Sequence, residues 1–318
     1  MQSKFSIMRK YILLILSIIA VTFLVNSCKE PDLTPVYIYI TPEDFVNCID
    51  VSKFNETHDQ NFDQEHLEAL TKHDFTHVNV YVNNKNLGCW ELPCKVPVLD
   101  VNSIDTSTLV LIPAFPLNGM TNTIMGYPFI NICRQKLLLQ KGTTYEVSQN
   151  RPKFIYSEYA KFPYFETFSN STSFTPSSSS LNAQNLIPTT FEGKNVGEVI
   201  LSDENGLSFD VTSSPFVAPV GSYRVMLEVR YKTEVNVSVA VKMSTAYNPY
   251  YAHPIAGLYA SPDKWKTIHL DLTNTINLNH NGTGGATQLN LILSGVGDEG
   301  KVSRVDIDDI KVIFIRTA

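Results

Sequence analysis

The sequence predicts an all-β protein made of two β-sandwich domains. Helical periodicity is almost absent, whereas Val, Thr, Tyr and Phe alternate with polar residues in many short runs. Asn, Gly, Pro and Ser bound these runs, as they do for strands joined by turns. The chain has 318 residues. Roughly 290 of them would remain after removal of an N-terminal signal, which is enough for two domains of moderate size.

The composition places the chain among globular proteins and excludes one class of partner. It has 43% hydrophobic residues, 18% charged residues and a formal net charge of -6. The chain is therefore too apolar to be disordered. Its acidity also means that no nucleic-acid partner is expected.

The N-terminus predicts a lipoprotein signal peptide over residues 1–27. Three basic residues are followed by the apolar run 11–25 and by small residues before Cys28. This order resembles a lipobox. A transmembrane anchor is the alternative, but a span needs about 20 apolar residues, and this run is shorter. We therefore expect cleavage before Cys28, acylation of that cysteine and firm anchoring by several acyl chains.

Residues 28–35 form the expected tether. The stretch Lys29-Glu30-Pro31-Asp32 resembles the charged export tag that sends lipoproteins of the phylum Bacteroidota across the outer membrane. The resemblance implies a protein that is lipid-anchored in the outer membrane and exposed on the cell surface. An ordinary polar tether on a periplasm-facing anchor is the alternative.

The first domain is expected over residues 36–150. Its clearest element is a hairpin of two strands, 78–82 and 87–92, joined by an Asn-rich turn. Asn tolerates the positive φ that such a turn requires. The hairpin, with Glu91-Leu92-Pro93 and Tyr127-Pro128-Phe129, resembles the N-terminal immunoglobulin-like domain of Bacteroidota surface lipoproteins. The resemblance implies a fold but no activity.

One helix-like stretch, residues 63–72, interrupts the strands of this domain. Asp63 can cap it, and its leucines share an apolar face. Four of the seven histidines lie around it, namely His58, His66, His73 and His77. They could hold a metal, but their spacing matches no ligand motif. We favour the alternative of a solvated polar loop.

Four cysteines fall in the first domain, namely Cys48, Cys89, Cys94 and Cys133. An oxidising envelope compartment favours disulfides, and four cysteines permit three connectivities. We favour Cys89 with Cys94, because Pro93 can bend the chain back, and Cys48 with Cys133. Buried free thiols are the alternative.

An aromatic linker, residues 151–164, leads to the second domain, residues 165–318. Residues 225–231 and 235–241 alternate regularly on either side of a short polar turn, which predicts a long hairpin. Further strands are expected at 268–272, 289–293 and 305–315. In the last of these the alternation slips at Asp308-Asp309, as a β-bulge requires.

The motifs of this domain carry a second resemblance. Phe165-Glu166-Thr167-Phe168 opens the domain, Trp265 precedes Ile268-His269-Leu270-Asp271-Leu272, and residues 305–312 close it. This order resembles the galactose-binding-like jelly roll of many carbohydrate-binding modules. The resemblance implies two packed antiparallel sheets and ligand binding by loops or a sheet face. Jelly rolls often hold a structural calcium, for which Glu166 and Asp309 are the candidates. No other cofactor is expected.

One segment concentrates the aromatic side chains that a glycan site needs. Flat rings pack against the apolar C–H face of a sugar, and this segment, predicted as a long loop, supplies Tyr247, Tyr250, Tyr251, His253 and Tyr259. The alternative is that these rings pack beneath the loop as a lid on the sandwich. Trp265 is expected in the core.

No catalytic motif is found in the sequence. Asp306 and Asp308 would point to one face of a strand and could form an acid pair, but a glycosidase with alternating acids would carry a third where this chain has Ile310. We therefore expect a non-catalytic surface lipoprotein that binds a glycan or another extracellular polymer. An accessory subunit of an outer-membrane protein complex and a cell-surface glycoside hydrolase are the alternatives.

Overall fold

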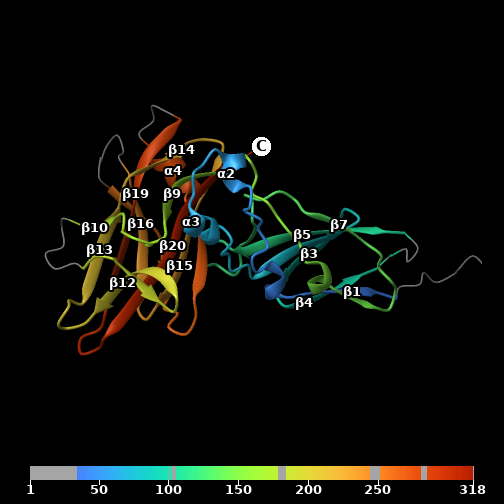
Figure 1. Ribbon diagram of the computed structural model, residues 1–318, viewed down its shortest axis with the longest axis horizontal. Coiled ribbons are helices and arrows are strands. Elements are labelled where there is room, and N and C mark those ends of the chain that lie inside the picture. The colour runs from blue at the N-terminus through green and yellow to red at the C-terminus, as the bar shows by residue number, and fades with distance from the viewer. Residues whose placement is uncertain are drawn as a thin grey trace, which may run out of the picture.

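The computed structural model describes residues 34–99, 101, 105–177, 184–243, 251–280 and 285–317. Two β-sandwiches lie next to each other, which confirms the predicted all-β class (Figure 1). Cys28, Tyr247 and Tyr250 lie outside the described residues. None of the helices in the described ranges is long and apolar enough to cross a membrane.

The first sandwich consists of a three-stranded and a five-stranded sheet. The smaller sheet has the order β4 (Cys94–Val98), β1 (Val36–Ile40) and β8 (Thr144–Glu146). The larger has the order β3 (Lys85–Glu91), β2 (His77–Val82), β5 (Ser107–Pro116) and β6 (Ile124–Gly126), and β7 (Arg134–Leu137) also pairs with β5. Alternate residues of both sheets are buried in one core, including Ile38, Val80, Val96 and Leu111. The immunoglobulin-like assignment of this sandwich stays a prediction.

Two local predictions for this sandwich are confirmed. β2 and β3 form the expected hairpin, and Asn83 and Asn84 at its turn have φ values of 50° and 65°. The predicted helix is α3 (Gln64–Ala69), where the Asp63 carboxylate accepts a hydrogen bond of 3.0 Å from the backbone N–H of His66. The other short helices are α2 (Phe54–His58) and the 3₁₀ turns η1 (Pro42–Phe45) and η2 (Val147–Asn150).

The second sandwich consists of two six-stranded sheets. The β19 sheet has the order β10 (Phe174–Pro176), β13 (Ser208–Ser213), β19 (Ala286–Val296), β16 (Val237–Met243) and β17 (Tyr251–Leu258), and β14 (Phe216–Pro219) also pairs with β19. The β20 sheet has the order β11 (Ile187–Phe191), β12 (Lys194–Leu201), β20 (Ser303–Arg316), β15 (Tyr223–Thr233) and β18 (Lys266–Asp271), and β9 (Lys161–Glu166) also pairs with β20. Helix α4 (Thr273–Asn279) follows β18.

The predicted long hairpin in this domain is wrong. β15 and β16 are consecutive, but β15 belongs to the β20 sheet and β16 to the β19 sheet. Each strand has one apolar face, and the core between the sheets accepts such a face from either side. Alternation therefore identified both strands but not their partners.

The predicted bulge at Asp308-Asp309 is confirmed. Val229 of β15 pairs with Ile310, whereas Tyr231 pairs with Ile307, so β20 has one extra residue between these pairs. Ile307 and Ile310 both point into the core of the second sandwich. The bulge therefore leaves both aspartates outside that core.

The structure contains neither of the predicted disulfides. Its free thiols are Cys48, Cys89, Cys94 and Cys133. Cys89 lies on β3 of the larger sheet and is exposed, whereas Cys94 lies on β4 of the smaller sheet and is buried. Cys48 is buried in the first core, which raises the pKa of its thiol to about 12. Cys133 is only partly buried against the same core.

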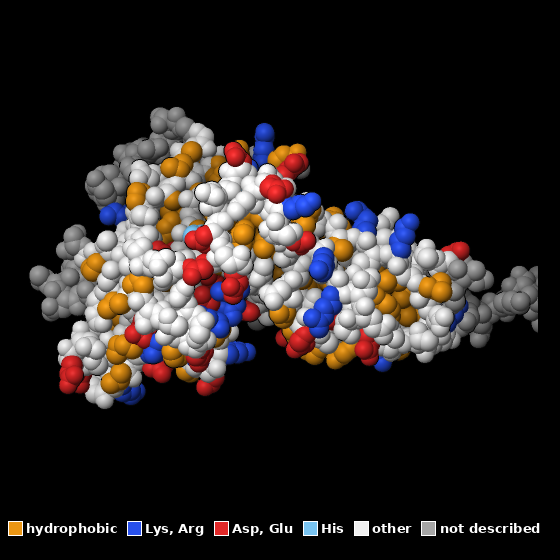
Figure 2. Space-filling model, viewed as in Figure 1, with side chains coloured by type: hydrophobic (Ala, Val, Ile, Leu, Met, Phe, Trp, Pro, Cys, Tyr) orange, Lys and Arg blue, Asp and Glu red, His pale blue; other side chains and the backbone are white. Residues whose placement is uncertain are grey.

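The first sandwich covers the outer face of the β20 sheet. Met226 and Ile313 of that sheet are buried in the hydrophobic core of the first sandwich. The backbone N–H of Asn118 donates to the carbonyl of His269 at 2.9 Å, and the Asn118 side chain accepts from the N–H of Asp271 at 2.8 Å. Charged side chains of both signs gather along this junction (Figure 2).

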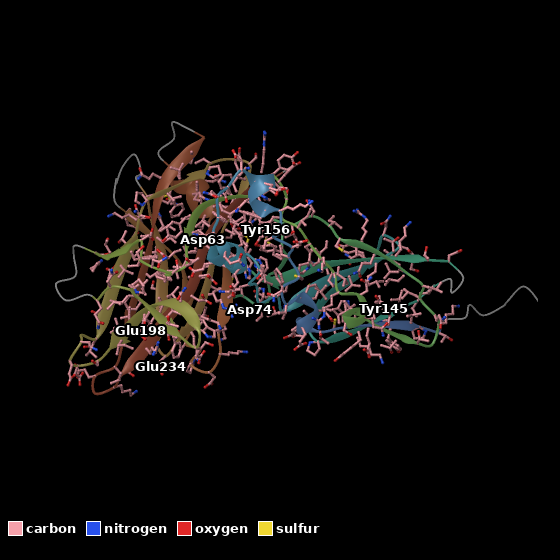
Figure 3. All side chains as sticks on the ribbon, in the orientation of Figure 1. Asp63, Asp74, Tyr145, Tyr156, Glu198 and Glu234 are labelled. Atoms are coloured by element: carbon pink, nitrogen blue, oxygen red, sulfur yellow. The ribbon has the colours of Figure 1, made fainter. Side chains whose placement is uncertain are left out.

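The segment predicted as a linker takes part in this junction. Phe154, Tyr156 and Phe162 are buried in the first core, and residues 161–166 form β9 of the second sandwich. In Figure 3, Tyr156 and Asp74 are labelled near the junction, whereas Tyr145 lies in the first sandwich and Glu234 in the second. The two sandwiches therefore share a continuous buried boundary.

Candidate functional site at the junction of the sandwiches

A cleft of about 550 Å³ lies where the two sandwiches meet. We call it the junction cleft. The first sandwich contributes the loop after α3 and the ends of β3 and β5, and the second contributes β18 and the residues before it. The lining residues on which the argument depends are His73, Asp74, Tyr259, Trp265, Thr267 and His269.

Three aromatic residues of the second sandwich line this cleft, and two of them, Tyr259 and Trp265, are not buried. Tyr259 directly follows β17 and is 76% exposed. Trp265 directly precedes β18 and is half-buried, and its indole N–H donates to a carboxylate oxygen of Glu192 at 2.9 Å. The guanidinium of Arg230 lies 6.0 Å from the Trp265 ring centroid. These contacts hold the Trp265 ring in place. Most of the Tyr259 side chain is exposed to solvent at the edge of the cleft.

The expectation that Trp265 belongs to the core is wrong. Side chains alternate between the two faces along β18, so Trp265 shares a face with Thr267 and His269. Leu270 points into the core of the second sandwich, and Ile268 packs against it, whereas His269 contacts the first sandwich. Trp265 therefore lies on the outer face of the β20 sheet, at the cleft.

The cleft also contains polar atoms without protein partners. Among the described residues, Asp74 Oδ2, Thr267 Oγ1 and His269 Nε2 are buried and have no hydrogen-bond partner. A buried polar atom without a partner costs about 1–3 kcal/mol. The lining thus combines ring faces with unmet hydrogen-bonding groups.

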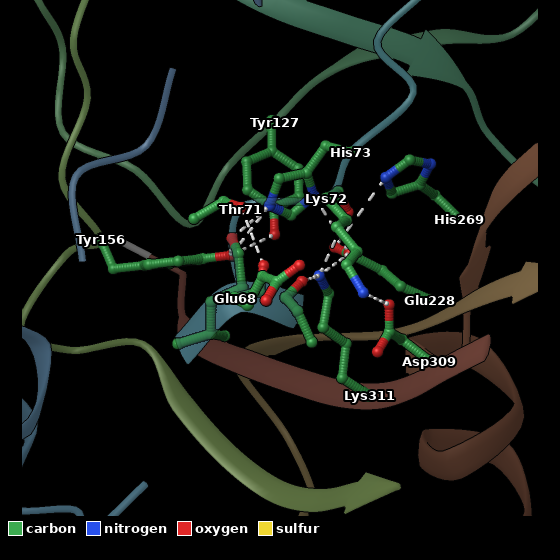
Figure 4. Close-up of polar contacts among 12 residues, drawn as sticks. Glu68, Thr71, Lys72, His73, Tyr127, Tyr156, Glu228, His269, Asp309 and Lys311 are labelled. Atoms are coloured by element: carbon green, nitrogen blue, oxygen red, sulfur yellow. Dashed lines mark hydrogen bonds and ion pairs between the residues drawn. The ribbon is translucent and has the colours of Figure 1, made fainter. Parts of the chain in front are cut away.

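A buried group of charged and imidazole side chains lies below the cleft (Figure 4). Glu228 of β15 is its centre. One carboxylate oxygen lies 3.1 Å from Lys311 Nζ and 3.2 Å from His73 Nδ1, and the other lies 3.9 Å from His269 Nε2. Lys311 also donates to the carbonyl of Ala69 at 2.9 Å. We call His73, Glu228, His269 and Lys311 the junction cluster.

Burial and mutual charge set the protonation of this cluster. Burial lowers the pKa of His269 to about 4 and also lowers the pKa of His73. Burial alone would raise the pKa of Glu228, but Lys311 and the two histidines hold it well below its usual range. At neutral pH these shifts favour a carboxylate at Glu228 and neutral imidazoles at His73 and His269.

The predicted aromatic segment does not form a single platform. Residues 251–258 are the edge strand β17, not the expected loop, and Pro254 is tolerated there because an edge strand has free N–H positions. Tyr251 and Tyr259 are at opposite ends of this strand, roughly 26 Å apart at the rise of a strand. Tyr251 packs edge-on against His253, with ring centroids 4.8 Å apart. Of the described members, only Tyr259 reaches the junction cleft.

The two residues predicted to bind calcium have different partners. The Glu166 carboxylate accepts from the backbone N–H groups of Phe168 and Ser173 at 3.0 and 2.6 Å. Asp309 lies 3.3 Å from the ammonium of Lys72. Calcium binding by this pair stays a prediction.

The four clustered histidines separate in the structure. His58 is buried against the carbonyl of Ser157, His66 pairs with Asp63 at the surface, and His77 begins β2. Only His73 enters the junction cluster.

Glu228, His269 and Lys311 were missed as site residues by sequence reasoning. Alternation with Leu227 and Val229 places Glu228 on the polar face of its strand, away from the core of the second sandwich. The sequence gives no sign that a second domain covers this face. The one available signal was that ionisable residues alternate with apolar ones on several neighbouring strands.

The sequence matches no protein family and no curated protein. Similar solved structures include the CBM22-1 xylan-binding domain from Paenibacillus barcinonensis, at 13% identity and a TM-score of 0.31, covering 50% of this chain and 97% of that one. Another is the K3 adhesin domain of Lys-gingipain from Porphyromonas gingivalis, at 12% identity and a TM-score of 0.33, covering 48% and 98%. A galactotriose-bound module, TmCBM61, has 13% identity and a TM-score of 0.25, covering 47% and 86%. At these identities and TM-scores, the likeness assigns the chain to no family.

Proposed function

We propose that this protein is a non-catalytic glycan-binding lipoprotein of the cell surface, and that the glycan binds in the junction cleft. One observation carries the proposal: the rings of Tyr259 and Trp265 line the same cleft as Asp74 and Thr267, each of which has a side-chain polar atom without a protein partner among the described residues. Ring faces bind the apolar side of a sugar, and polar atoms bind its hydroxyl groups.

The carboxylates suggested for hydrolysis are engaged elsewhere. Asp306 accepts from Arg304 Nε at 2.7 Å, and Asp308 lies 3.2 Å from Arg230 Nε. Neither residue lines the junction cleft. Glycan binding therefore fits the cleft better than glycoside hydrolysis by Asp306 and Asp308.

Single substitutions in the cleft test this proposal. Tyr259→Ala and Thr267→Val should each weaken binding about 10-fold, because one removes a ring face and the other a hydroxyl group. Tyr251→Ala is the matched control, since Tyr251 is an exposed tyrosine at the far end of the same strand. Binding would be measured by affinity electrophoresis in xylan, galactan, pectin and mucin, then by calorimetry on the best polymer.

The control separates the cleft from other sites. An equal loss of glycan binding in Tyr251→Ala and Tyr259→Ala would indicate that the glycan binds along the outer surface of β17 instead. Unchanged binding in both cleft variants, with normal circular dichroism, would exclude the junction cleft. Failure of the wild-type chain to bind any polymer while it co-purifies with one membrane complex would favour the accessory-subunit alternative.

A further inference from the structure

The junction cluster brings three potential metal ligands together from both sandwiches. His73 follows α3 in the first sandwich, Glu228 lies on β15, and His269 lies on β18 (Figure 4). All three side chains are buried, and their ligand atoms lie within 4.8 Å of one another. Within the described part of the chain, no other group of three His, Cys, Asp or Glu residues meets this spacing.

Two of the ligand atoms have no close polar partner apart from each other among the described residues. His269 Nε2 and the Glu228 oxygen that faces it, 3.9 Å away, are buried and form no hydrogen bond among the described residues. The other Glu228 oxygen lies 3.1 Å from Lys311 Nζ and 3.2 Å from His73 Nδ1. Buried polar atoms in native structures usually have a partner, so the first pair calls for an explanation.

His73 is positioned by two groups buried with the first core. Its Nε2 lies 2.9 Å from the carbonyl oxygen of Leu70 and 3.0 Å from the hydroxyl of Tyr156. Its Nδ1 faces a carboxylate oxygen of Glu228, 3.2 Å away. The ring therefore presents Nδ1 to the centre of the cluster.

We propose that His73, Glu228 and His269 bind one divalent transition-metal ion of the zinc class, which links the two sandwiches. Two imidazole nitrogens and a carboxylate oxygen form a ligand set typical of zinc. Zinc–ligand distances near 2.0–2.2 Å place neighbouring ligand atoms about 3.3–3.5 Å apart. His73 Nδ1 lies 3.2 Å from one Glu228 oxygen, close to this separation, whereas His269 Nε2 lies 3.9 Å from the other and would move closer when the ion binds.

The surroundings of the cluster fit a metal site. Lys311 contacts the Glu228 oxygen that also faces His73, which fixes the carboxylate orientation, and the second oxygen faces His269. Asp74, whose Oδ2 has no partner, supplies a second negative charge at the same cleft. His73 and His269 also line the junction cleft, so an ion and a water ligand can enter from solvent. This proposal does not depend on glycan binding.

Metal titration of the full-length protein in detergent tests the proposal. After treatment with a chelator, the wild-type protein should bind one equivalent of Zn²⁺ in calorimetry, and its melting temperature should rise with Zn²⁺. Co²⁺ should give the visible absorption of a tetrahedral or five-coordinate site, a readout that needs no variant. Folded wild-type protein without stoichiometric binding of either ion would overturn the proposal.

Variants locate the ion. Glu228→Gln and His269→Gln keep side-chain size and should weaken Zn²⁺ binding at least 100-fold and abolish the Co²⁺ spectrum. His66→Gln is the matched control, because this histidine lies close by on α3 but at the surface. Zinc binding that survives in both ligand variants, or that is lost in His66→Gln, would show that the ion is bound elsewhere and would overturn the assignment.

Discussion

Charged residues buried at the junction are compensated in two adjoining groups. In one, Lys311 neutralises Glu228. In the other, Lys72 lies 3.5 Å from Asp308 and 3.3 Å from Asp309. A buried ion of either sign is costly unless it is paired, so these contacts are needed for the junction to close. The bulge in β20 matters here because it turns both aspartates towards Lys72.

Asp308 should make the stability of the protein depend on pH. Burial raises the pKa of its carboxyl to about 7, with Asp309 adding to the rise and Lys72, Arg230 and Lys194 opposing it. The folded state then keeps a proton that the unfolded state releases near pH 4, so this contribution to stability is full below pH 4 and is lost as pH rises through about 7.

Thermal unfolding of Asp308→Asn would measure this effect. Between pH 5.5 and pH 8 the wild type should lose about 1–2 kcal/mol of unfolding free energy through this group, and the variant should lose less. Asp263→Asn, in an exposed turn before β18, is the control. Parallel pH profiles for the wild type and Asp308→Asn would contradict the prediction.

At the scale of elements, a close contact between Phe168 and Gly197 determines how the chain after β9 packs on β12. Phe168 follows β9, is 1% exposed and has a φ of 54°. Its ring lies over Gly197 of β12, where a Cβ atom would come within 2.4 Å of the ring. The glycine therefore allows β12 to pass beneath an aromatic ring that cannot move without opening the core.

Gly197→Ala should destabilise the fold by about 1–3 kcal/mol, because the added methyl group overpacks this contact. The control is Gly257→Ala on the edge strand β17, where a Cβ atom meets nothing within 4 Å. Urea unfolding would compare the two midpoints. A midpoint for Gly197→Ala equal to that of Gly257→Ala would mean that Phe168 relaxes freely.

At the scale of the whole molecule, the two sandwiches pack against each other and share buried residues, whereas the sequence predicted two domains joined by a linker. Met226 and Ile313 of the second sandwich belong to the core of the first, and β9 continues directly from residues buried in that core. Both proposed sites, the junction cleft and the junction cluster, exist only because of this contact. Separating the sandwiches would remove both.

Membrane attachment is a prediction that concerns the N-terminal segment. Cys28→Ala removes the proposed acyl acceptor, so metabolic labelling with an alkyne fatty acid should fail and the protein should leave the outer-membrane fraction. Cys133→Ala, a partly buried cysteine of the first sandwich, should keep both the label and the location. A fatty-acid label that persists on Cys28→Ala would rule out lipidation at this cysteine.

The sequence by itself determined the features that depend on neighbouring residues. The all-β class, the Asn83-Asn84 hairpin, the Asp63-capped helix and the bulge at Asp308-Asp309 follow from alternation, turn chemistry and capping, and each was predicted. These signals are local, because the conformational preferences that cause them act within a few residues.

Only the tertiary structure decided which faces and strands meet. Alternation shows that one face of a strand is buried, but it does not show what covers the other face or which sheet the strand joins. For this reason the predicted pairing of β15 with β16 is wrong, the predicted core position of Trp265 is wrong, and the burial of Glu228 was not predicted. The junction cluster joins His73 to His269 across two domains, and that contact results from the packing of one sandwich on the other rather than from any local pattern.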